Sequence, residues 1–231
     1  MTDISALQKA IEQFAYSNGK DTKQVMSDLL KFIIGNFNPQ PEPIQHWNYT
    51  KEQNKEFHNM MLLWLQVMQS ALETREWYDP WGDLFMALTP KGGARGQFFT
   101  PTDICDMMAD ICDPATAEPT RVCGAFGKRV TVSDCACGSG RNLLAAHAKF
   151  IEAKARKPYL VAEDIDLDCC RMTAVNMMAH GCFGEVICHN TLTQPKQLVV
   201  GYLINESMYP IPCPLPSIRI KREPEWFVSL R

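Results

Sequence analysis

Residues 132–140 read Val-Ser-Asp-Cys-Ala-Cys-Gly-Ser-Gly, a short β-prone run that passes through an acid into a glycine-rich turn. A helical pattern follows over residues 143–151. A strand, a glycine-rich turn and a helix in this order are typical of the first unit of a nucleotide-binding α/β fold. Gly138 and Gly140 permit a positive φ and place no side chain between the backbone and a ligand. We therefore expect a cofactor to lie over this turn.

On both sides of this stretch, β-prone runs alternate with helical patterns. We expect strands at 130–133, 159–162, 185–188 and 198–204, an edge strand at 217–221, and helices at 102–111 and 167–180. This alternation predicts a parallel sheet with covering helices, beginning near residue 95.

The first third of the chain is helical in pattern. Apolar residues recur at helical spacing from Ile4 to Phe14, a second helix is expected over 21–35, and a third over 50–72. The pairs Asp21 with Gln24 and Thr50 with Gln53 match capping boxes at two of these helix starts. We expect a helical N-terminal region over 1–94 and an α/β domain over 95–231.

Composition limits the partners and the compartment. The 231 residues carry a formal net charge of -3, and Lys and Arg are scattered, so the chain lacks the basic surface that unaided DNA binding needs. Ten cysteines, without an apolar leader at the N-terminus, predict reduced thiols and a cytoplasmic protein. No stretch approaches the roughly 20 apolar residues of a membrane span, so we expect no membrane.

Acidic and amide side chains are expected at the ends of the predicted strands. Asp134 ends the first strand, and Asp164 lies at the end of the second, about 24 residues after Gly140, where a carboxylate can bind ribose hydroxyls. Asp166 is expected to cap the following helix. Asn190, after the third strand, either reads an adenine edge or is an ordinary turn residue.

The segment Gly-Gln-Phe-Phe-Thr-Pro at residues 96–101 precedes the helix at 102–111. We expect Thr100 as the N-cap of this helix, Pro101 as its first residue, and Asp103 at a capping-box spacing. The N–H groups of such a helix start favour an anion such as a carboxylate. Capping does not explain the two aromatic residues before Thr100.

The segments GQFFTP, DCACGSG, AEDID and NTL, in this order, resemble adenine-specific DNA methyltransferases, above all the modification subunits of type I restriction systems. The resemblance covers roughly residues 50–195. It implies an abbreviated, Rossmann-like S-adenosylmethionine-dependent methyltransferase sheet with an N-terminal helical bundle. The residues that it implies for S-adenosylmethionine binding are Phe98, Phe99, Thr100, Pro101, Asp134, Ala136, Cys137, Gly138, Ser139, Gly140, Asn142, Glu163, Asp164, Ile165, Asn190, Thr191 and Leu192. Cys135 stands where the family usually has Pro.

The family's catalytic motif, Asn or Asp followed by Pro-Pro and an aromatic residue, is expected at the end of the fourth strand. There the amide binds the flipped adenine and the aromatic ring stacks on it. The corresponding residues are 203–210, in which Asn205 and Tyr209 are the candidates and the Pro-Pro step is missing. Two functions follow: an adenine methyltransferase that acts on DNA with a specificity or restriction subunit, or a catalytically impaired accessory or regulatory subunit that binds S-adenosylmethionine.

Two other classes are disfavoured. Cysteines and a histidine could suggest a metal protein: Cys135, Cys137, Cys169, Cys170, Cys182, Cys188 and His189. Paired C-x-x-C stations are absent, so we expect no metal site. A nicotinamide-dependent dehydrogenase would continue its turn to a third glycine, whereas Gly140 is followed by Arg141-Asn142-Leu143.

Overall fold

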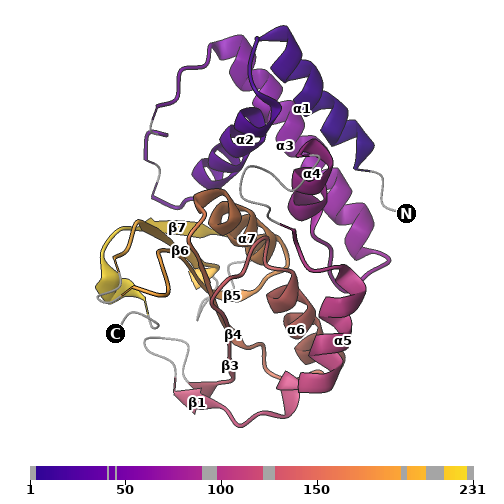
Figure 1. Cartoon of the computed structure of the whole chain (residues 1–231), viewed down its shortest axis with the longest axis vertical. Coiled ribbons are helices and arrows are strands. Elements are labelled where there is room, and N and C mark those ends of the chain that lie inside the picture. Colours follow the sequence, from indigo (N-terminus) through magenta and orange to yellow (C-terminus); the bar gives the residue numbers. More distant parts are fainter. Residues whose placement is uncertain are drawn as a thin grey trace. The chain divides into compact units, whose positions relative to one another are not determined.

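The structure, a computed structural model, describes residues 4–40, 42–44, 46–89, 98–121, 128–193, 197–206 and 216–227. The chain divides into two compact units, one formed by Met1–Asn36 with Pro41–Phe98 and the other by Phe37–Gln40 with Phe99–Arg231. Figure 1 shows the helices and strands of both. No helix in the described ranges is long and apolar enough to cross a bilayer.

The first unit is helical. It contains α1 (Ser5–Ser17), α2 (Thr22–Asn36), α3 (Lys51–Leu72) and α4 (Pro80–Leu88). Helices α1 and α2 pack on each other and on α3, and the ring of Phe57 on α3 lies 5.1 Å from that of Phe14 on α1. The nine-residue helix α4, which the sequence did not predict, begins at Pro80 with the side chain of Asp79 as its cap.

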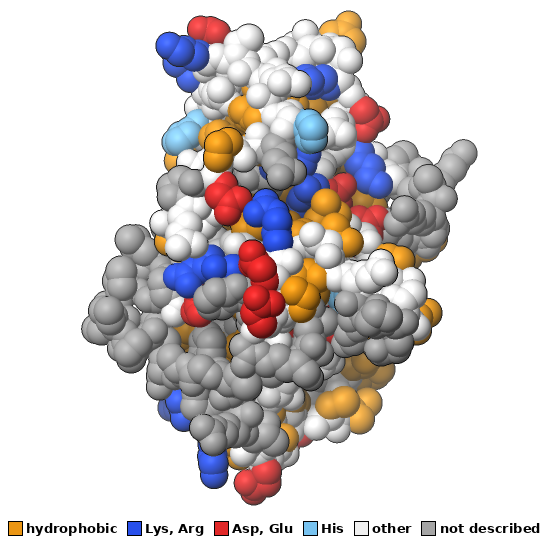
Figure 2. Space-filling view, turned by 90° about the vertical axis from the view of Figure 1, so that its left-hand side faces the viewer, with side chains coloured by type: hydrophobic (Ala, Val, Ile, Leu, Met, Phe, Trp, Pro, Cys, Tyr) orange, Lys and Arg blue, Asp and Glu red, His pale blue; other side chains and the backbone are white. Residues whose placement is uncertain are grey.

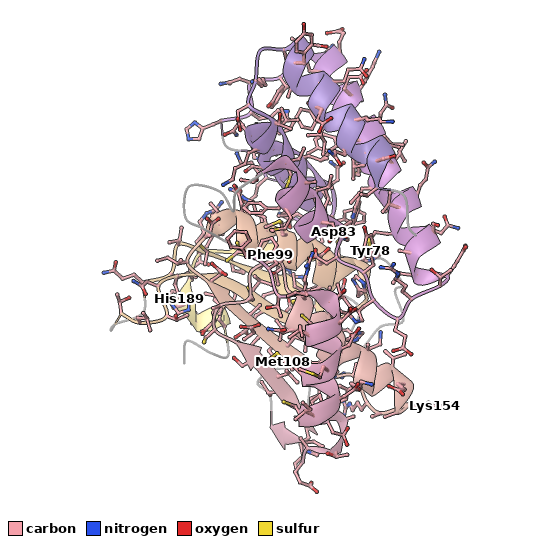
Figure 3. All side chains as sticks on the ribbon, turned by 45° about the vertical axis from the view of Figure 1, so that its right-hand side comes forward. Tyr78, Asp83, Phe99, Met108, Lys154 and His189 are labelled. Carbon is pink, nitrogen blue, oxygen red and sulfur yellow. The ribbon has the colours of Figure 1, made fainter. Side chains whose placement is uncertain are left out.

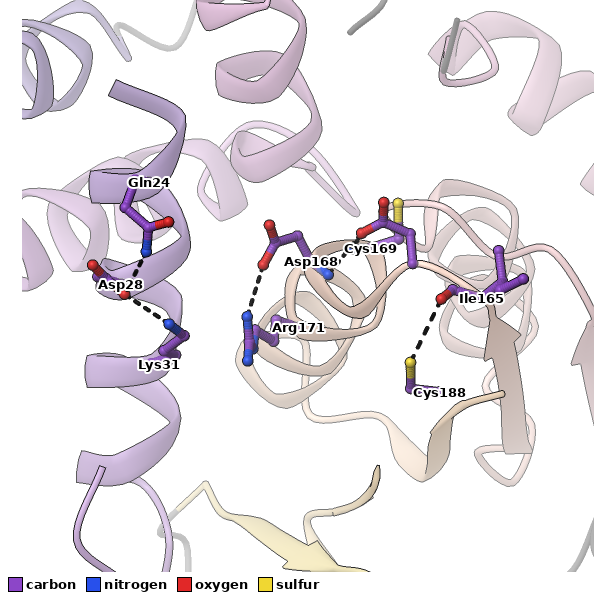
Figure 4. A network of polar contacts seen from close by, with 9 residues as sticks. Gln24, Asp28, Lys31, Ile165, Asp168, Cys169, Arg171 and Cys188 are labelled. Carbon is purple, nitrogen blue, oxygen red and sulfur yellow. Dashed lines mark hydrogen bonds and ion pairs between the residues drawn. The ribbon is translucent and has the colours of Figure 1, made fainter. Parts of the chain in front are cut away.

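The predicted helix starts differ in their capping. Thr50 and Gln53 form the full capping box, in which each side chain bonds the other's backbone N–H. Asp21 accepts a hydrogen bond from the backbone N–H of Gln24, but the Gln24 side chain bonds Asp28. Figure 4 shows this contact, together with the ion pair between Asp28 and Lys31. Asp21 therefore caps α2 without the reciprocal half of the box.

The second unit is α/β. It contains α5 (Thr102–Cys112), η1 (Pro114–Thr116), β1 (Thr120–Arg121), β2 (Lys128–Arg129), β3 (Thr131–Asp134), α6 (Arg141–Glu152), β4 (Tyr159–Asp164), α7 (Leu167–Ala179), β5 (Phe183–Cys188), β6 (Val200–Ile204), β7 (Ile218–Lys221) and η4 (Pro224–Trp226). The pair β1 and β2, which the sequence did not predict, is a separate two-stranded sheet. Helix α6 packs on β3, and α7 packs on β4, β5 and β6.

The main sheet has the order β3-β4-β5-β6-β7. The strands β3, β4 and β5 are parallel, as predicted, whereas β6 is antiparallel to β5 and β7 is antiparallel to β6. The expected parallel fourth strand is therefore wrong. A parallel return needs a crossover, usually helical, and the described residues between β5 and β6, 189–193 and 197–199, contain no helix.

Candidate functional site

The glycine-rich turn links the end of β3 to the start of α6. Gly138 and Gly140 both adopt the positive φ predicted for them, 55° and 91°. A Cβ added at Gly138 would lie 2.9 Å from Cδ1 of Phe99, closer than non-bonded atoms approach. Residue 138 therefore has to be glycine for reasons of both conformation and space.

The turn is fastened to the end of β4. The backbone N–H of Cys137 donates to the carbonyl oxygen of Glu163 (3.0 Å). The N–H of Gly138 donates to Oδ2 of Asp164 (2.9 Å), and the N–H of Asp166 donates to Oδ1 of the same carboxylate (2.8 Å). Because β3 and β4 are parallel, this fastening lies at their common carboxyl edge, where ligands bind in open α/β sheets.

Two side chains of α7 bond the other side of the turn. Oγ1 of Thr173 donates to the carbonyl oxygen of Gly138 (2.8 Å), and Nδ2 of Asn176 donates to that of Ser139 (2.9 Å). Both side chains are fully buried. Sequence reasoning missed them, although two polar residues three apart in an otherwise apolar helix face were the available signal.

Asp134 remains accessible at the end of β3. Its Oδ1 accepts the backbone N–H of Ala136 (3.1 Å), and its Oδ2 accepts Nδ2 of Asn142 (3.3 Å). The side chain is half-buried. A carboxylate in this position offers a negative charge to a cationic ligand group above the turn.

Asp164 and Glu163, adjacent in the sequence, have different surroundings. Burial raises the pKa of Asp164 above its ordinary value, although the N–H bonds from Asp166 and Gly138 oppose the shift. The carboxylate of Glu163 is buried and lies 3.2 Å from Nε2 of His189. Successive side chains of a strand point to opposite faces, so the side chain of Asp164 points to the face opposite that of Glu163. Asp164 therefore remains the candidate for binding the ribose. Asp166 caps α7, as predicted.

Phe99 and Thr100 are joined to the turn through Arg141, the first residue of α6. Nη1 of Arg141 donates to the carbonyl oxygen of Thr100 (3.1 Å), and the guanidinium lies 5.8 Å from the centroid of the Phe99 ring. Figure 3 labels Phe99. Arg141 was not among the predicted site residues. Phe98, the other predicted aromatic residue, is 69% exposed.

The start of α5 differs from its prediction. The helix begins at Thr102 with Pro101 as the N-cap residue, and no side chain caps it. The N–H groups of Ile104 and Cys105 bond the carbonyl oxygen of Pro101. The assignment of Thr100 as N-cap and Pro101 as first helical residue is therefore wrong, because the first helical carbonyl belongs to Pro101 while Arg141 engages that of Thr100.

The residues after β5 form a turn near the same edge. Oδ1 of Asn190 accepts the backbone N–H of Leu192 (3.0 Å), which is the bonding of an ordinary turn residue. Leu192 is 92% exposed, and Thr191 is partly buried. Ile165, at the end of β4, is also exposed, and its carbonyl oxygen accepts from Sγ of Cys188 (Figure 4).

Asn205 lies far from the glycine-rich turn. Since β6 is antiparallel to β5, its last residue pairs with Gly184 at the amino end of β5, and Asn205 follows there. Its fully buried amide donates to the carbonyl oxygens of Met178 and Cys182 and accepts the N–H of Ser217. The expectation that Asn205 faces the cofactor is wrong, because the strand runs the other way. Tyr209 lies outside the described residues.

Of the two thiols in the glycine-rich turn, Cys135 is exposed and Cys137 is buried. Burial raises the pKa of Cys137 well above its ordinary value, so this thiol stays protonated at neutral pH. Within the described ranges, no group of three or more His, Cys, Asp or Glu side chains is arranged to hold a metal ion.

The family model of the N-6 DNA methylases matches residues 84–207, more than half of the chain. This match covers the segment before α5, the glycine-rich turn, the acids after β4 and the turn after β5. A search of the curated proteins and a search of the solved structures gave no match.

Proposed function

Since the chain belongs to the N-6 DNA methylase family, we propose that it binds S-adenosylmethionine over residues 134–140 and transfers the methyl group to the exocyclic amino group of adenine in DNA. Its fold is that of an S-adenosylmethionine-dependent methyltransferase. The observation that carries the proposal is the hydrogen bond between Gly138 and Asp164, which couples the turn to the acid of the next strand.

The residues of this edge fit the cofactor. Gly138 has a positive φ and carries no side chain, so residue 138 places no Cβ between the turn and a ligand. The carboxylates of Asp134 and Asp164 lie at the ends of neighbouring strands. Asp134 matches the cationic methionine end, and Asp164 matches the ribose hydroxyls as an acceptor. Bound there, S-adenosylmethionine supplies an electrophilic methyl group on its sulfonium.

The chain's own contribution is positioning. Methyl transfer needs the acceptor nitrogen and the methyl carbon in line at contact distance, so a rigid turn matters more than acid–base chemistry. Thr173, Asn176 and Asp164 bond consecutive peptide groups of the turn, which fixes its conformation. The Phe99 ring lies against Gly138.

We propose that DNA is held with help from another subunit, such as a specificity or restriction subunit. On the face in Figure 2, basic and acidic side chains are interspersed, with no continuous basic area among the described ones. The net charge of -3 agrees with this. The cysteines of the described ranges are free thiols, which suits the reducing cytoplasm that we propose as the compartment.

The position of Asn205 favours a second candidate function. Its amide is used entirely in the core, at the opposite end of β5 from Asp164. In the sequence, no Asn or Asp is followed by the Pro-Pro step of the family's motif. A subunit that binds S-adenosylmethionine and assists methylation by a partner fits this observation.

Calorimetry with S-adenosylmethionine, and with NAD as a comparison, tests the binding. We expect the chain to bind S-adenosylmethionine and not NAD. Asp164→Ala, which removes a charged acceptor, should lower the affinity for S-adenosylmethionine by about tenfold or more. Asp168→Ala is the matched control, since Asp168 pairs with Arg171 on α7. Absence of binding at millimolar concentration would defeat both candidate functions.

Transfer of a tritiated methyl group to DNA of varied sequence separates the two candidates. Incorporation by the chain supports the methyltransferase. Binding of the cofactor without incorporation by the chain, even with a specificity or restriction subunit added, supports the accessory subunit.

A further inference from the structure

Strand β3, which leads into the glycine-rich turn, has an open edge in the described part of the chain. All four of its residues pair with β4, and it pairs with no other described strand. The N–H of Tyr159 donates to the carbonyl oxygen of Val130. In a parallel ladder, alternate residues bond the same neighbour, so the N–H and C=O groups of Thr131 and Ser133 point toward the open edge.

The side chains of β3 are uncovered as well. Thr131 and Ser133 are exposed, and Val132 and Asp134 are only partly buried. The adjacent strand β4 is buried at every residue from 159 to 163. Parallel strands are normally covered on both faces, so β3 has the exposure of a strand that lacks a neighbour.

Helix α5 is the neighbour of α6 in the helix layer of this unit. It packs on α6, which packs on β3, whereas α7 packs on β4 and β5. Figure 1 shows α7, α6 and α5 in this order across the helix layer. The helix layer therefore continues past α6 in the direction that leads from β5 to β3 in the sheet.

Apolar side chains form a stripe along α5, at the spacing of one helix face. The members of this α5 stripe are Ile104, Met107, Met108 and Ile111, exposed by 41%, 49%, 44% and 76%. Figure 3 labels Met108. The exposed carboxylates of Asp103 and Asp106 border the stripe on the helix surface, and so does that of Asp110, which is paired with Lys149 of α6. An apolar stripe with a charged border is typical of a protein-binding surface.

We propose that the open edge of β3 and the α5 stripe together bind a second, different polypeptide, which adds a strand parallel to β3 and covers the stripe with apolar residues bordered by Lys and Arg. The row of N–H and C=O groups on Thr131 and Ser133 selects an extended strand. The acidic border selects basic side chains and disfavours DNA at this surface.

The added strand completes the ligand crevice. In a doubly wound sheet, this crevice lies where the strand before the glycine-rich turn has neighbours on both sides, and β3 has a described neighbour on one side only. The partner's strand then ends beside Asp134, where it supplies the groups that bind the methyl acceptor. In this last respect the inference rests on the proposed function.

Photo-crosslinking in the cells that produce the chain tests the docking. A photoreactive amino acid is placed at Ser133 or at Met108, with the 91% exposed Tyr16 of α1 as the control position. We expect one polypeptide to be captured at both test positions, at least tenfold more than at Tyr16. The crosslinked segment should alternate apolar residues and carry Lys or Arg, and the purified partner should raise methyl transfer to DNA.

Two variants locate the surface. Thr131→Pro removes an N–H from the open edge and leaves the β3–β4 ladder intact, and Met108→Lys with Ile111→Lys places charge on exposed positions of the stripe. Each should reduce crosslinking by tenfold or more, whereas Leu62→Lys on α3 should not.

Crosslinks to a second copy of the chain, different proteins at the two positions, or no capture above the control each overturn the docking. Calorimetry on the free chain is independent of the partner. If the chain did not bind S-adenosylmethionine but the crosslinks formed as expected, the proposed function would be wrong and the docking would not. If it bound S-adenosylmethionine but the crosslinks did not form, only the docking would be wrong.

Discussion

The hydroxyl of Thr173 on α7 donates a 2.8 Å hydrogen bond to the carbonyl oxygen of Gly138 in the glycine-rich turn. The two residues are far apart in the sequence, and the bond is partly buried. It ties the turn, which would otherwise be a loop between β3 and α6, to a helix that packs on four strands. The conformation of the candidate cofactor site therefore depends on α7.

Thr173→Val should lower the free energy of unfolding by about 1–2 kcal/mol, because the Gly138 carbonyl loses its buried partner. The affinity for S-adenosylmethionine should fall with it. Denaturant unfolding and calorimetry measure the two effects. Thr173→Ser retains the hydroxyl and should keep most of the affinity. Equal behaviour of the Val and Ser variants would show that the bond has no part in shaping the turn.

Gly138→Ala should destabilise the chain more than Gly19→Ala does. Both glycines have a φ near +55° to +60°, so both variants carry the left-handed backbone cost of about 1–2 kcal/mol. Only at Gly138 does the new Cβ meet a neighbour, the Phe99 ring, whereas at Gly19 it meets nothing within 4 Å. Thermal unfolding of the two variants isolates the packing contribution. A smaller loss at Gly138 would contradict the close approach of Phe99.

The affinity for S-adenosylmethionine should fall on acidification, because Asp164 becomes protonated. The same protonation should not destabilise the fold. Burial raises the folded pKa of Asp164 above the ordinary 3.8. Its ionised form is therefore lost at a higher pH than that of an exposed acid, and with it the acceptor for the ribose. Protonation of a group whose folded pKa is raised favours the folded state. Calorimetry across pH 4–7 should show the loss, and Asp164→Asn should bind weakly with little pH dependence.

His147 should make the fold sensitive to acid. Burial, assisted by the positive charge of Lys157, lowers the pKa of this histidine from 6.5 to about 3. Between these values the unfolded chain binds a proton that the folded chain does not, so stability rises with pH and is lost as pH falls below 6.5. The slope is about 1.4 kcal/mol per pH unit near pH 5. His147→Gln should flatten this part of the stability profile, and an unchanged profile would contradict the burial of a neutral imidazole.

Asn205→Ala should cost about 2–4 kcal/mol of stability, because the buried Cys182 carbonyl and the Ser217 N–H lose their bonds to the amide, and the Met178 carbonyl keeps only the N–H of Gly181. Asn190→Ala, at a partly buried turn residue, should cost under 1 kcal/mol. Chemical denaturation measures both. If Asn205→Ala unfolded like the parent chain but lost methyl transfer, the amide would have the catalytic use that the sequence suggested.

Local patterns in the sequence were sufficient for every α-helix except α4 and for the strands β3, β4 and β5, but not for the pair β1 and β2. The alternation of β-prone and helical runs gave β3, α6, β4, α7 and β5, and the glycines gave the turn. The direction of β6 was not predictable from its composition, since Val200–Ile204 is equally suited to either orientation. Its orientation depends on the short connection from β5, a property of chain length and topology.

The candidate site was predictable where a residue acts through its own local geometry. Gly138, Gly140, Asp164 and the helix cap Asp166 belong to this class. Thr173 and Arg141 act over long sequence distances, through contacts that only the packing of α7 and α6 creates. Asn205 was misplaced because a family motif was transferred to a strand that runs the other way.

The order of the strands in the main sheet repeats their order in the chain, from β3 to β7. Each strand can therefore join its predecessor as it leaves the ribosome, with no need to wait for a later segment to be inserted between two existing strands. Short loop closures of this kind favour rapid folding. Assembly of this sheet therefore has a direction in time: among the described strands β7 joins last, and β3, the first to form, keeps one side without a described neighbour.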